Sequence, residues 1–512
     1  MKSSRGAKGQ AASDVDEEAW RVGFMSPPSI NNNKRRAEDV AHSNSREVMV
    51  RGSEASVDEL EFEDEFEDEF EQEEFVEGEE GEEGEGGLEA SFADDGVNPR
   101  LGGRLFRAGD ELNDGEELQV DSTAYDMLHR AHLEWPCLTF GIAKDSLGDA
   151  RTAFPHTAYF VAGTQADRPY ANRILCLKFS HMCKTKHDDE SDPESDDEDD
   201  TEDDPLLESQ SIAHPGTINR LKLMPQATHI CATWSDDSNV RLWDLSHQLS
   251  TLQAPGKGTG GASGRGEPLH TLTCHTEEGF GLDWSNVVPG LLASADCSGK
   301  VQAMRGSAAG GWTLDAEALV GHEGSVEDVC WSPVEAGVLM SCGCDSTVRV
   351  WDVRKRSAAA ITVKEEHGVD VNVISWNYLV NYLVVSGADD GSFRVWDLRS
   401  IRNAEPVALF KWHRGAITSI EWSPHESSTL AVSGADNQLT LWDFALEDDP
   451  EAEHAVKGRE DLQDIPPQLY FVHQGQQDMK EVHWHKQIPG VLASTAGDSF
   501  HVFKPANVGD GA

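Results

Sequence analysis

Residues 348–353 read Val-Arg-Val-Trp-Asp-Val, and three other stretches of the chain repeat this pattern closely. They are VRLWDL at 240–245, FRVWDL at 393–398 and LTLWDF at 439–444. Apolar and polar residues alternate in each stretch, which predicts a β-strand with one buried face. An aspartate in a polar turn stands six positions before each tryptophan, namely Asp237, Asp345, Asp390 and Asp436. A turn and the strand after it therefore recur as a unit about every 45 residues.

The units also share their openings, which contain a histidine such as His322 or His413 and then a Trp-Ser-Pro strand. Two degenerate units end at Met304 and Phe503, and strand-like runs at 157–163 and 173–179 supply one more. These features identify WD repeats and predict an all-β, seven-bladed WD-repeat β-propeller. Because a ring must leave no exposed strand edge, we expect its N-terminal and C-terminal strands to meet at one closure point.

The composition indicates the kind of partner. The 512 residues contain 42 Lys and Arg against 93 Asp and Glu, a net charge of −51. Such a charge repels nucleic acid and anionic membranes and concentrates cations, so we expect a basic protein partner and no direct nucleic-acid or membrane binding. No apolar run approaches the roughly 20 residues of a membrane span, and the N-terminus does not resemble a signal peptide. We expect a soluble, monomeric, intracellular protein.

Much of the negative charge lies in two tracts. Residues 61–85 hold 16 acidic residues and residues 188–204 hold 13, which predicts disorder in both. The first tract also contains regularly spaced aromatic residues, Phe62, Phe66, Phe70 and Phe75. They could anchor a basic, partly apolar surface; a solubilising tail and a transient amphipathic helix are the alternatives.

The segment before the propeller carries two helical stripes. Asp121 or Ser122 is a plausible N-cap, and the first stripe, ending before Pro136, consists of Ala124, Leu128, Ala131 and Trp135. The second stripe consists of Tyr125, His129 and His132. We expect a helix that packs on the propeller through the first stripe and presents the second to a partner, unless both stripes pack on the propeller.

The expected organisation has four parts. A disordered acidic region covers 1–118, and the N-terminal α-helix covers 119–136. The propeller covers 137–505 with acidic insertions near 183–206 and 446–465, and a tail covers 506–512.

Two segments resemble a known family. Residues 125–140, YDMLHRAHLEWPCLTF, resemble the N-terminal helix and Trp-Pro turn of the histone-binding WD-repeat proteins of the retinoblastoma-binding and chromatin-assembly class. Residues 464–473, DIPPQLYFVH, are similar to that family's Pro-Pro loop. The resemblance implies a groove between helix and loop that takes a basic helix of the client. The candidate groove residues are Tyr125, Leu128, His129, His132, Glu447, Asp448, Asp449, Asp461, Asp464, Pro466, Pro467 and Leu469.

The acidic N-terminal tract resembles that of a narrower branch, the glutamate-rich WD-repeat proteins involved in ribosome assembly. This resemblance implies a nuclear or nucleolar escort that binds a basic large-subunit ribosomal protein and can also bind histones. The sequence itself indicates only a site suited to a basic helix.

Nothing in the sequence predicts an enzyme. His322, Ser341 and Asp345 could be mistaken for a catalytic triad, but the set recurs from unit to unit, as expected of a structural hydrogen-bond network. The glycine-rich stretch 256–266 lacks the strand and helix of a phosphate-binding loop. Cys342 and Cys344 lack a second ligand pair for a metal, and the nine cysteines are expected to be reduced. We expect no cofactor and no metal.

Two alternatives belong to other functional classes. The pairs Asp352/Arg354 and Asp397/Arg399 fit the WDxR pattern of substrate receptors in cullin-type ubiquitin ligases, although such an arginine can simply face solvent or an acidic loop. A ligase-adaptor role is therefore one alternative. The other is a scaffold without a basic client, which the paired helix and Pro-Pro loop disfavour.

Overall fold

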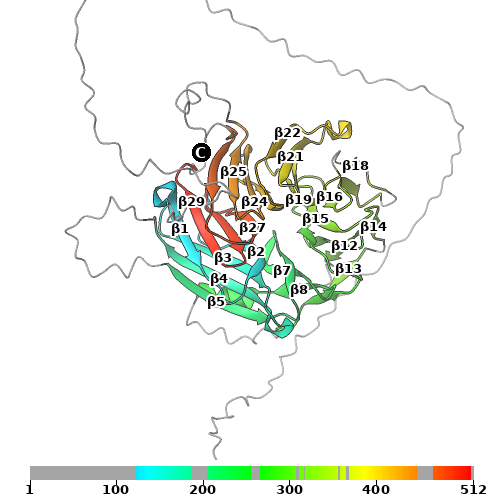
Figure 1. Cartoon of the computed structure of the whole chain (residues 1–512). Helices are drawn as coiled ribbons and strands as arrows, with labels where there is room; N and C mark the ends of the chain where they lie inside the picture. Colours follow the sequence, from blue (N-terminus) through cyan, green and yellow to red (C-terminus); the bar gives the residue numbers. More distant parts are fainter. Residues whose placement is uncertain are drawn as a thin grey trace, which may run out of the picture. The chain divides into compact units, whose positions relative to one another are not determined.

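The computed structural model describes residues 121–185, 205–254, 266–306, 311–315, 317–355, 358–364, 368–446 and 465–508. Within these residues the strands form seven antiparallel sheets, each a blade with four strands that we call a, b, c and d from the innermost outward (Figure 1). The predicted seven-bladed WD-repeat propeller is confirmed.

The strand bounds, from blade 1 to blade 7, are as follows. The a strands are β2 (Cys137–Ala143), β6 (Ile218–Met224), β10 (Gly281–Trp284), β15 (Val326–Trp331), β19 (Val371–Trp376), β23 (Ile417–Trp422) and β27 (Met479–Trp484). The b strands are β3 (His156–Thr164), β7 (Ala227–Ser235), β11 (Leu291–Ala295), β16 (Val338–Gly343), β20 (Leu383–Ala388), β24 (Thr429–Gly434) and β28 (Leu492–Ala496). The c strands are β4 (Arg173–Met182), β8 (Val240–Asp244), β12 (Lys300–Gly306), β17 (Thr347–Asp352), β21 (Ser392–Asp397), β25 (Leu439–Asp443) and β29 (Phe500–Pro505). The d strands are β5 (Leu206–Ala213), β9 (His270–Leu272), β13 (Trp312–Leu314), β18 (Ile361–Lys364), β22 (Ala408–Lys411), β26 (Leu469–His473) and, in blade 7, β1 (Tyr125–Ala131).

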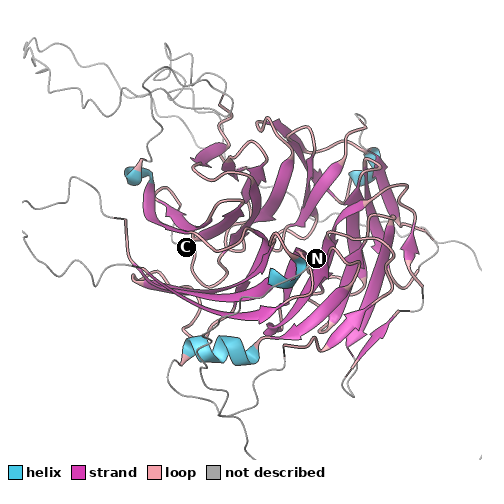
Figure 2. Ribbon diagram, turned by 60° about the horizontal axis from the view of Figure 1, so that its bottom comes forward, coloured by secondary structure: helices cyan, strands magenta, loops and turns pink. Residues whose placement is uncertain are grey.

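The remaining elements are short. Strand β14 (Leu319–Val320) also pairs with β12, and one α-helix, α1 (Ser246–Gln253), follows β8 at the rim of the propeller (Figure 2). Single 3-10 turns are η2 (Ser122–Ala124), η3 (Pro169–Ala171) and η6 (Ile401–Asn403).

Each Trp-Asp unit is held by a buried hydrogen-bond network. In blade 4 the indole of Trp351 donates to Ser341 Oγ at 2.8 Å, and His322 bridges Ser341 at 2.7 Å and Asp345 at 3.0 Å. The b–c turn that carries Asp345 places Ser346 at φ 60°, a left-handed conformation that Gly391 supplies in blade 5 at φ 78°. The repeated aspartate therefore ties the turn to the blade's core.

The ring closes through β1. This strand pairs antiparallel with β29, from Tyr125 opposite Pro505 to Ala131 opposite Phe500, and Figure 1 shows the two side by side. The innermost strand of blade 7 packs against that of blade 1, as in every other neighbouring pair. The expected closure point is confirmed: the N-terminal strand completes the last blade and covers its edge.

The helix predicted over 119–136 is wrong in the described part of that range, residues 121–136. Asp121 is indeed a cap, because its carboxylate accepts from Thr123 N at 3.0 Å, but it caps only the turn η2, and Tyr125–Ala131 then form a strand. Tyr125, Met127 and Ala131 are buried at odd positions, which fits a strand as well as the apolar spacing fits a helix. Here the unpaired edge of β29 offers a ladder of hydrogen bonds, and this tertiary contact decides the outcome.

The topology gives the propeller two kinds of loop face. Loops joining a to b and c to d emerge at one end, here the a–b face; loops joining b to c, and each d strand to the next blade, emerge at the opposite b–c face. The chain enters β1 at the a–b face. Residues 186–204 join β4 to β5 and residues 447–464 join β25 to β26, so both acidic insertions start and end at the a–b face. The insertions themselves, the tract 61–85 with Phe62, Phe66, Phe70 and Phe75, and the end of the tail lie outside the described residues.

Candidate functional site

Tyr125 joins the two halves of the predicted groove. Its side chain is buried, and its hydroxyl lies 2.8 Å from Nδ1 of His473, at the end of the strand that follows the Pro-Pro turn. The ring of Phe471 packs against Tyr125 edge to face at 5.3 Å. Burial raises the pKa of Tyr125 far above its usual value, while burial and then His501 hold the pKa of His473 well below its usual value. Both groups are therefore neutral at pH 7, and the contact is a buried hydrogen bond.

The other predicted residues of β1 and its following loop also contact the propeller. Leu128 is partly buried, and its backbone N–H donates to Thr185 Oγ1 at 2.9 Å. His129 Nε2 lies 3.0 Å from the carbonyl oxygen of Cys183, and His132 Nδ1 lies 3.0 Å from that of Asp498. The alternative in which both stripes pack on the propeller thus describes Tyr125 and His129 best.

The Pro-Pro segment is a tight turn. Leu469 N donates to the carbonyl of Pro466 at 3.0 Å, and the Leu469 side chain is buried among the apolar residues of blade 6, while Pro467 is exposed. This turn is at the a–b face, whereas His132, in the loop after β1, is at the b–c face. The predicted groove is therefore not assembled as one surface in the described residues. Its acidic members lie outside them: Glu447, Asp448, Asp449, Asp461 and Asp464.

A different acidic surface lies on the b–c face. Five carboxylates from blades 3 to 5 follow one another along these loops, and we call them the acidic arc: Glu277, Glu278, Glu327, Asp370 and Asp389. Backbone hydrogen bonds set their order, from Cys297 N to Glu278 O at 2.9 Å and from Asp389 N to Asp370 O at 3.0 Å. Glu277, Glu278 and Asp389 are exposed. Within the described residues, no Lys or Arg forms an ion pair with any member of the arc.

The arc has a measurable effect on its neighbours. The thiol of Cys344 donates to Glu327 at 3.2 Å, and its pKa is raised by burial and then by Glu327 and Asp370. Glu278, Glu327 and Glu277 all act on the pKa of Cys297 in the same direction, after the effect of burial. The arc is therefore a continuous region of negative potential. Sequence reasoning missed it, although Glu-Glu shortly after His275 and Asp-Asp before Gly391 were a signal.

A buried ion cluster lies in the centre of the ring. Glu481, only 2 % exposed, accepts from Arg220 at 2.7 Å, lies 3.4 Å from Lys222 Nζ and accepts from Phe140 N at 2.8 Å. It thereby joins blade 7 to blades 1 and 2. Burial alone would raise the pKa of Glu481, yet Lys222, His483 and Arg220 hold it well below its usual value.

Comparison with known proteins decides the family. Residues 115–183 match the family model of the histone-binding protein RBBP4 and its counterpart in the CAF1 complex, and residues 207–244, 316–352, 360–397 and 404–443 match "WD domain, G-beta repeat". The chain is 41% identical over 483 residues to Ribosome assembly protein rrb1 of Schizosaccharomyces pombe, which covers 92% of this chain and 99% of the relative. It is 46% identical over 417 residues to Glutamate-rich WD repeat-containing protein 1 of Dictyostelium discoideum, covering 79% and 85%. The chain belongs to the glutamate-rich WD-repeat family.

More distant similarity reaches the histone-binding class. The chain is 25% identical over 407 residues to Histone-binding protein MSI1 of Saccharomyces cerevisiae, covering 75% of this chain and 90% of the relative. Both resemblances seen in the sequence, to the glutamate-rich branch and to the wider histone-binding class, are confirmed.

In this glutamate-rich WD-repeat protein the two WDxR pairs have the same local geometry. Arg354 Nε donates to Asp352 at 2.7 Å, and Arg399 donates to Asp397 at 2.6 Å; the arginine side chains are 67% and 66% exposed. Both pairs follow c strands of adjacent blades, so they share the a–b face. The guanidinium of Arg399 also lies over the ring of Tyr382, 3.7 Å from its centroid. Each arginine is thus pre-positioned by its own aspartate but remains accessible.

The candidate metal ligands do not converge. The nine cysteines are free thiols, with Cys342 buried and Cys344 exposed. Among the described residues, no three His, Cys, Asp or Glu side chains are grouped as metal ligands would be. None of the helices in those residues has the length and hydropathy of a membrane span.

Proposed function

We propose that the chain is a non-enzymatic escort of a basic protein, a large-subunit ribosomal protein or a histone, and that it acts in ribosome assembly in the nucleus and nucleolus. The observation that carries this proposal is the acidic arc, because five carboxylates without a cationic partner among the described residues can each accept a hydrogen bond from Arg or Lys of a client.

Family membership supports the same function. One relative is named for ribosome assembly and a more distant one for histone binding. The net charge of −51 would attract a basic client before contact is made. A propeller of this kind provides a rigid platform, which suits a binding protein and requires no cofactor.

The groove residues keep a role in this proposal, in a changed form. Leu128, His132 and Pro467 remain at least partly accessible, whereas the buried Tyr125 and Leu469 would act by holding the strands that carry them. We expect the client to contact the arc through its charges and the β1 region through apolar side chains.

Reversing three charges of the arc tests the proposal. The triple variant Glu277→Lys, Glu278→Lys, Asp389→Lys of the full-length chain should recover core histones and large-subunit ribosomal proteins from nuclear extract at least about tenfold less, which corresponds to roughly 1.4 kcal/mol of binding free energy. Mass spectrometry of the recovered proteins measures this. The matched control reverses three exposed acids away from the arc, Glu267→Lys, Glu335→Lys and Glu405→Lys, and changes the net charge equally. Equal losses in both variants would mean that net charge, and not the arc, holds the client.

A role as substrate receptor of a cullin-type ligase is the second candidate. The observation that favours it is the repetition of one exposed Asp-Arg geometry on neighbouring blades at a single face. Such paired, pre-positioned guanidinium groups suit a partner that offers acidic or carbonyl acceptors.

The double variant Arg354→Ala, Arg399→Ala should lose most of any co-purifying cullin-ligase adaptor, as judged by quantitative mass spectrometry, and still recover the basic client. Arg402→Ala, another exposed arginine on blade 5, is the control and should retain the adaptor. If the double variant retrieved as much adaptor as the control, the WDxR pairs would be ordinary turn residues.

A further inference from the structure

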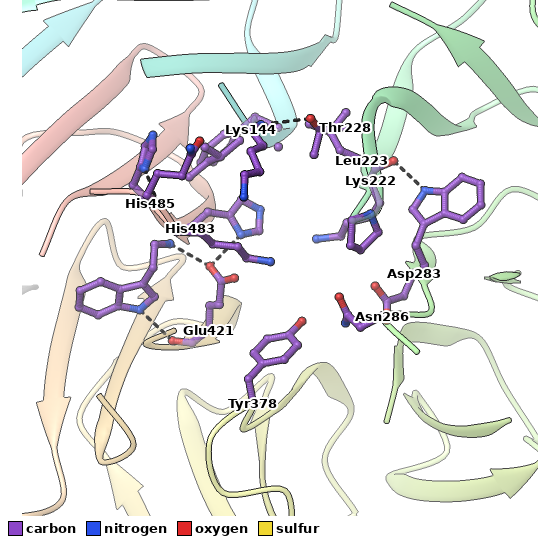
Figure 3. Close-up of a pocket in the computed structure, with 18 of the residues that line it drawn as sticks. Lys144, Lys222, Leu223, Thr228, Asp283, Asn286, Tyr378, Glu421, His483 and His485 are labelled. Carbon is purple, nitrogen blue, oxygen red and sulfur yellow. Dashed lines mark hydrogen bonds and ion pairs between the residues drawn. The ribbon is translucent and has the colours of Figure 1, made fainter. Parts of the chain in front are cut away.

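A cavity of about 490 Å³ opens at the a–b face, at the end of the central channel opposite the acidic arc. Residues of six blades line it, and Figure 3 shows the side chains of Lys222, Asp283, Tyr378 and Glu421 directed toward a common space. A cavity of this volume, built from residues of a rigid ring, has the dimensions of a ligand site.

The cavity is cationic in a strongly acidic chain. Lys144, Lys222 and Lys486 line it, and His483 adds a fourth cation, because Glu421 and Glu481 raise its pKa despite the opposing effect of burial. Lys144 is 62% exposed and Lys222 is 27% exposed.

The negative charge around these cations is reduced. The carboxylate of Glu481 is shared between Arg220 and Lys222. Burial raises the pKa of Asp283 to about 7, so that this carboxyl is partly uncharged. The cavity therefore offers more positive than negative charge to a ligand.

Its walls and rim are apolar. The rings of Phe140, Trp284 and Trp484 contribute to the walls. At the rim Tyr378 is 36% exposed and Leu379 is 52% exposed, and Lys486 Nζ lies 5.4 Å from the centre of the Tyr378 ring. Ammonium groups beside aromatic rings match a ligand that combines carboxylates with aromatic side chains.

The chain itself contains such a ligand. Residues 61–75, EFEDEFEDEFEQEEF, place a phenylalanine every four or five positions among acidic residues. The chain enters β1 at the same a–b face, with residues 76–120 between the tract and Asp121. A flexible linker of that length spans roughly 40 Å, and tethering gives the tract an effective concentration of millimolar order at the cavity. An untethered ligand of equal affinity would compete poorly.

We propose that the channel-mouth cavity binds the chain's own acidic, phenylalanine-bearing tract at residues 61–75. A docked tract is withheld from a basic client, so client and cavity compete for it. This inference concerns the face opposite the acidic arc and does not depend on the client's identity.

Site-specific photocrosslinking of the full-length protein tests the proposal. A p-benzoylphenylalanine in place of Leu379 should crosslink within the same chain to residues 61–75, with a yield independent of protein concentration, as peptide mass spectrometry measures. The same group in place of Val320, which is exposed on β14 away from the cavity, should give at least fivefold less of this product. Combining the Leu379 label with Lys144→Glu and Lys486→Glu should reduce the yield by a similar factor.

The charge variants need a folding control. The neutral pair Lys144→Gln and Lys486→Gln should keep the same unfolding midpoint and give an intermediate yield. Equal yields from positions 379 and 320, a yield that the lysine variants do not change, or crosslinks only to a second molecule would each overturn the proposal.

Discussion

Replacing Glu481 by alanine should lower the free energy of unfolding by about 3 to 5 kcal/mol, since it leaves a buried cationic cluster without its counter-charge. Arg220 and Lys222 both reach this carboxylate, and Phe140 N would lose its acceptor. Equilibrium urea unfolding, followed by tryptophan fluorescence, measures the change. Glu323→Ala, which removes an exposed carboxylate, should leave the midpoint nearly unchanged.

The same residue predicts a pH dependence. The pKa of Glu481 is lower in the folded than in the unfolded chain, so its stabilisation is present above the unfolded value of about 4.3 and is lost as the pH falls through the folded value. Below about pH 4 the unfolding midpoint of the wild type should therefore fall more steeply than that of Glu481→Gln. Parallel curves for the two proteins would show that the cluster does not hold Glu481 ionised.

Replacing Met127 by alanine should cost about 2 to 5 kcal/mol, although the residue lies on the N-terminal strand and outside every WD unit. Its side chain is fully buried in a cluster with Phe140, Phe160 and Phe500, which belong to blades 1 and 7. The cavity left behind would weaken the contact that closes the ring. Urea unfolding measures the loss, and limited proteolysis should cut the chain near residue 130 more quickly than in the wild type.

Arg130→Ala is the matched control for Met127, because Arg130 lies on the same strand and is exposed. It should unfold within about 0.5 kcal/mol of the wild type. If both variants unfolded at the same urea concentration, β1 would not be part of the closed blade in solution.

The repeated blades could be predicted from sequence because their determinants are local. The Asp at a fixed offset before Trp351 or Trp396 lies in the same turn and strand as its partner, so spacing alone identified the unit. The closure point followed from the requirement that a ring leave no free edge. The conformation of residues 125–131 could not be obtained this way, since steps of three and four positions fit both helix and strand, and the deciding partner, β29, lies at the other end of the chain.

The candidate site was less accessible to sequence reasoning for a similar reason. Glu278, Glu327 and Asp370 are far apart in the chain and become neighbours only because the b–c loops of consecutive blades share a face. Tyr125 and the strand after Leu469 were correctly paired through the family resemblance, but their burial depends on packing that no local pattern records. Where the partners are distant, only the assembled ring shows which side chains remain available.

The closing strand also imposes an order on biosynthesis. Tyr125 is hydrogen-bonded to a residue 348 positions later, and its strand pairs with the very last strand of the propeller. Such long-range pairing raises the contact order and slows folding, because the entropy of loop closure must be overcome before the contact forms. A growing polypeptide on the ribosome cannot complete the seventh blade until nearly all of it has been synthesised. Until then β1, which is translated first, has no partner, and this exposed strand is a natural substrate for chaperones that act during translation.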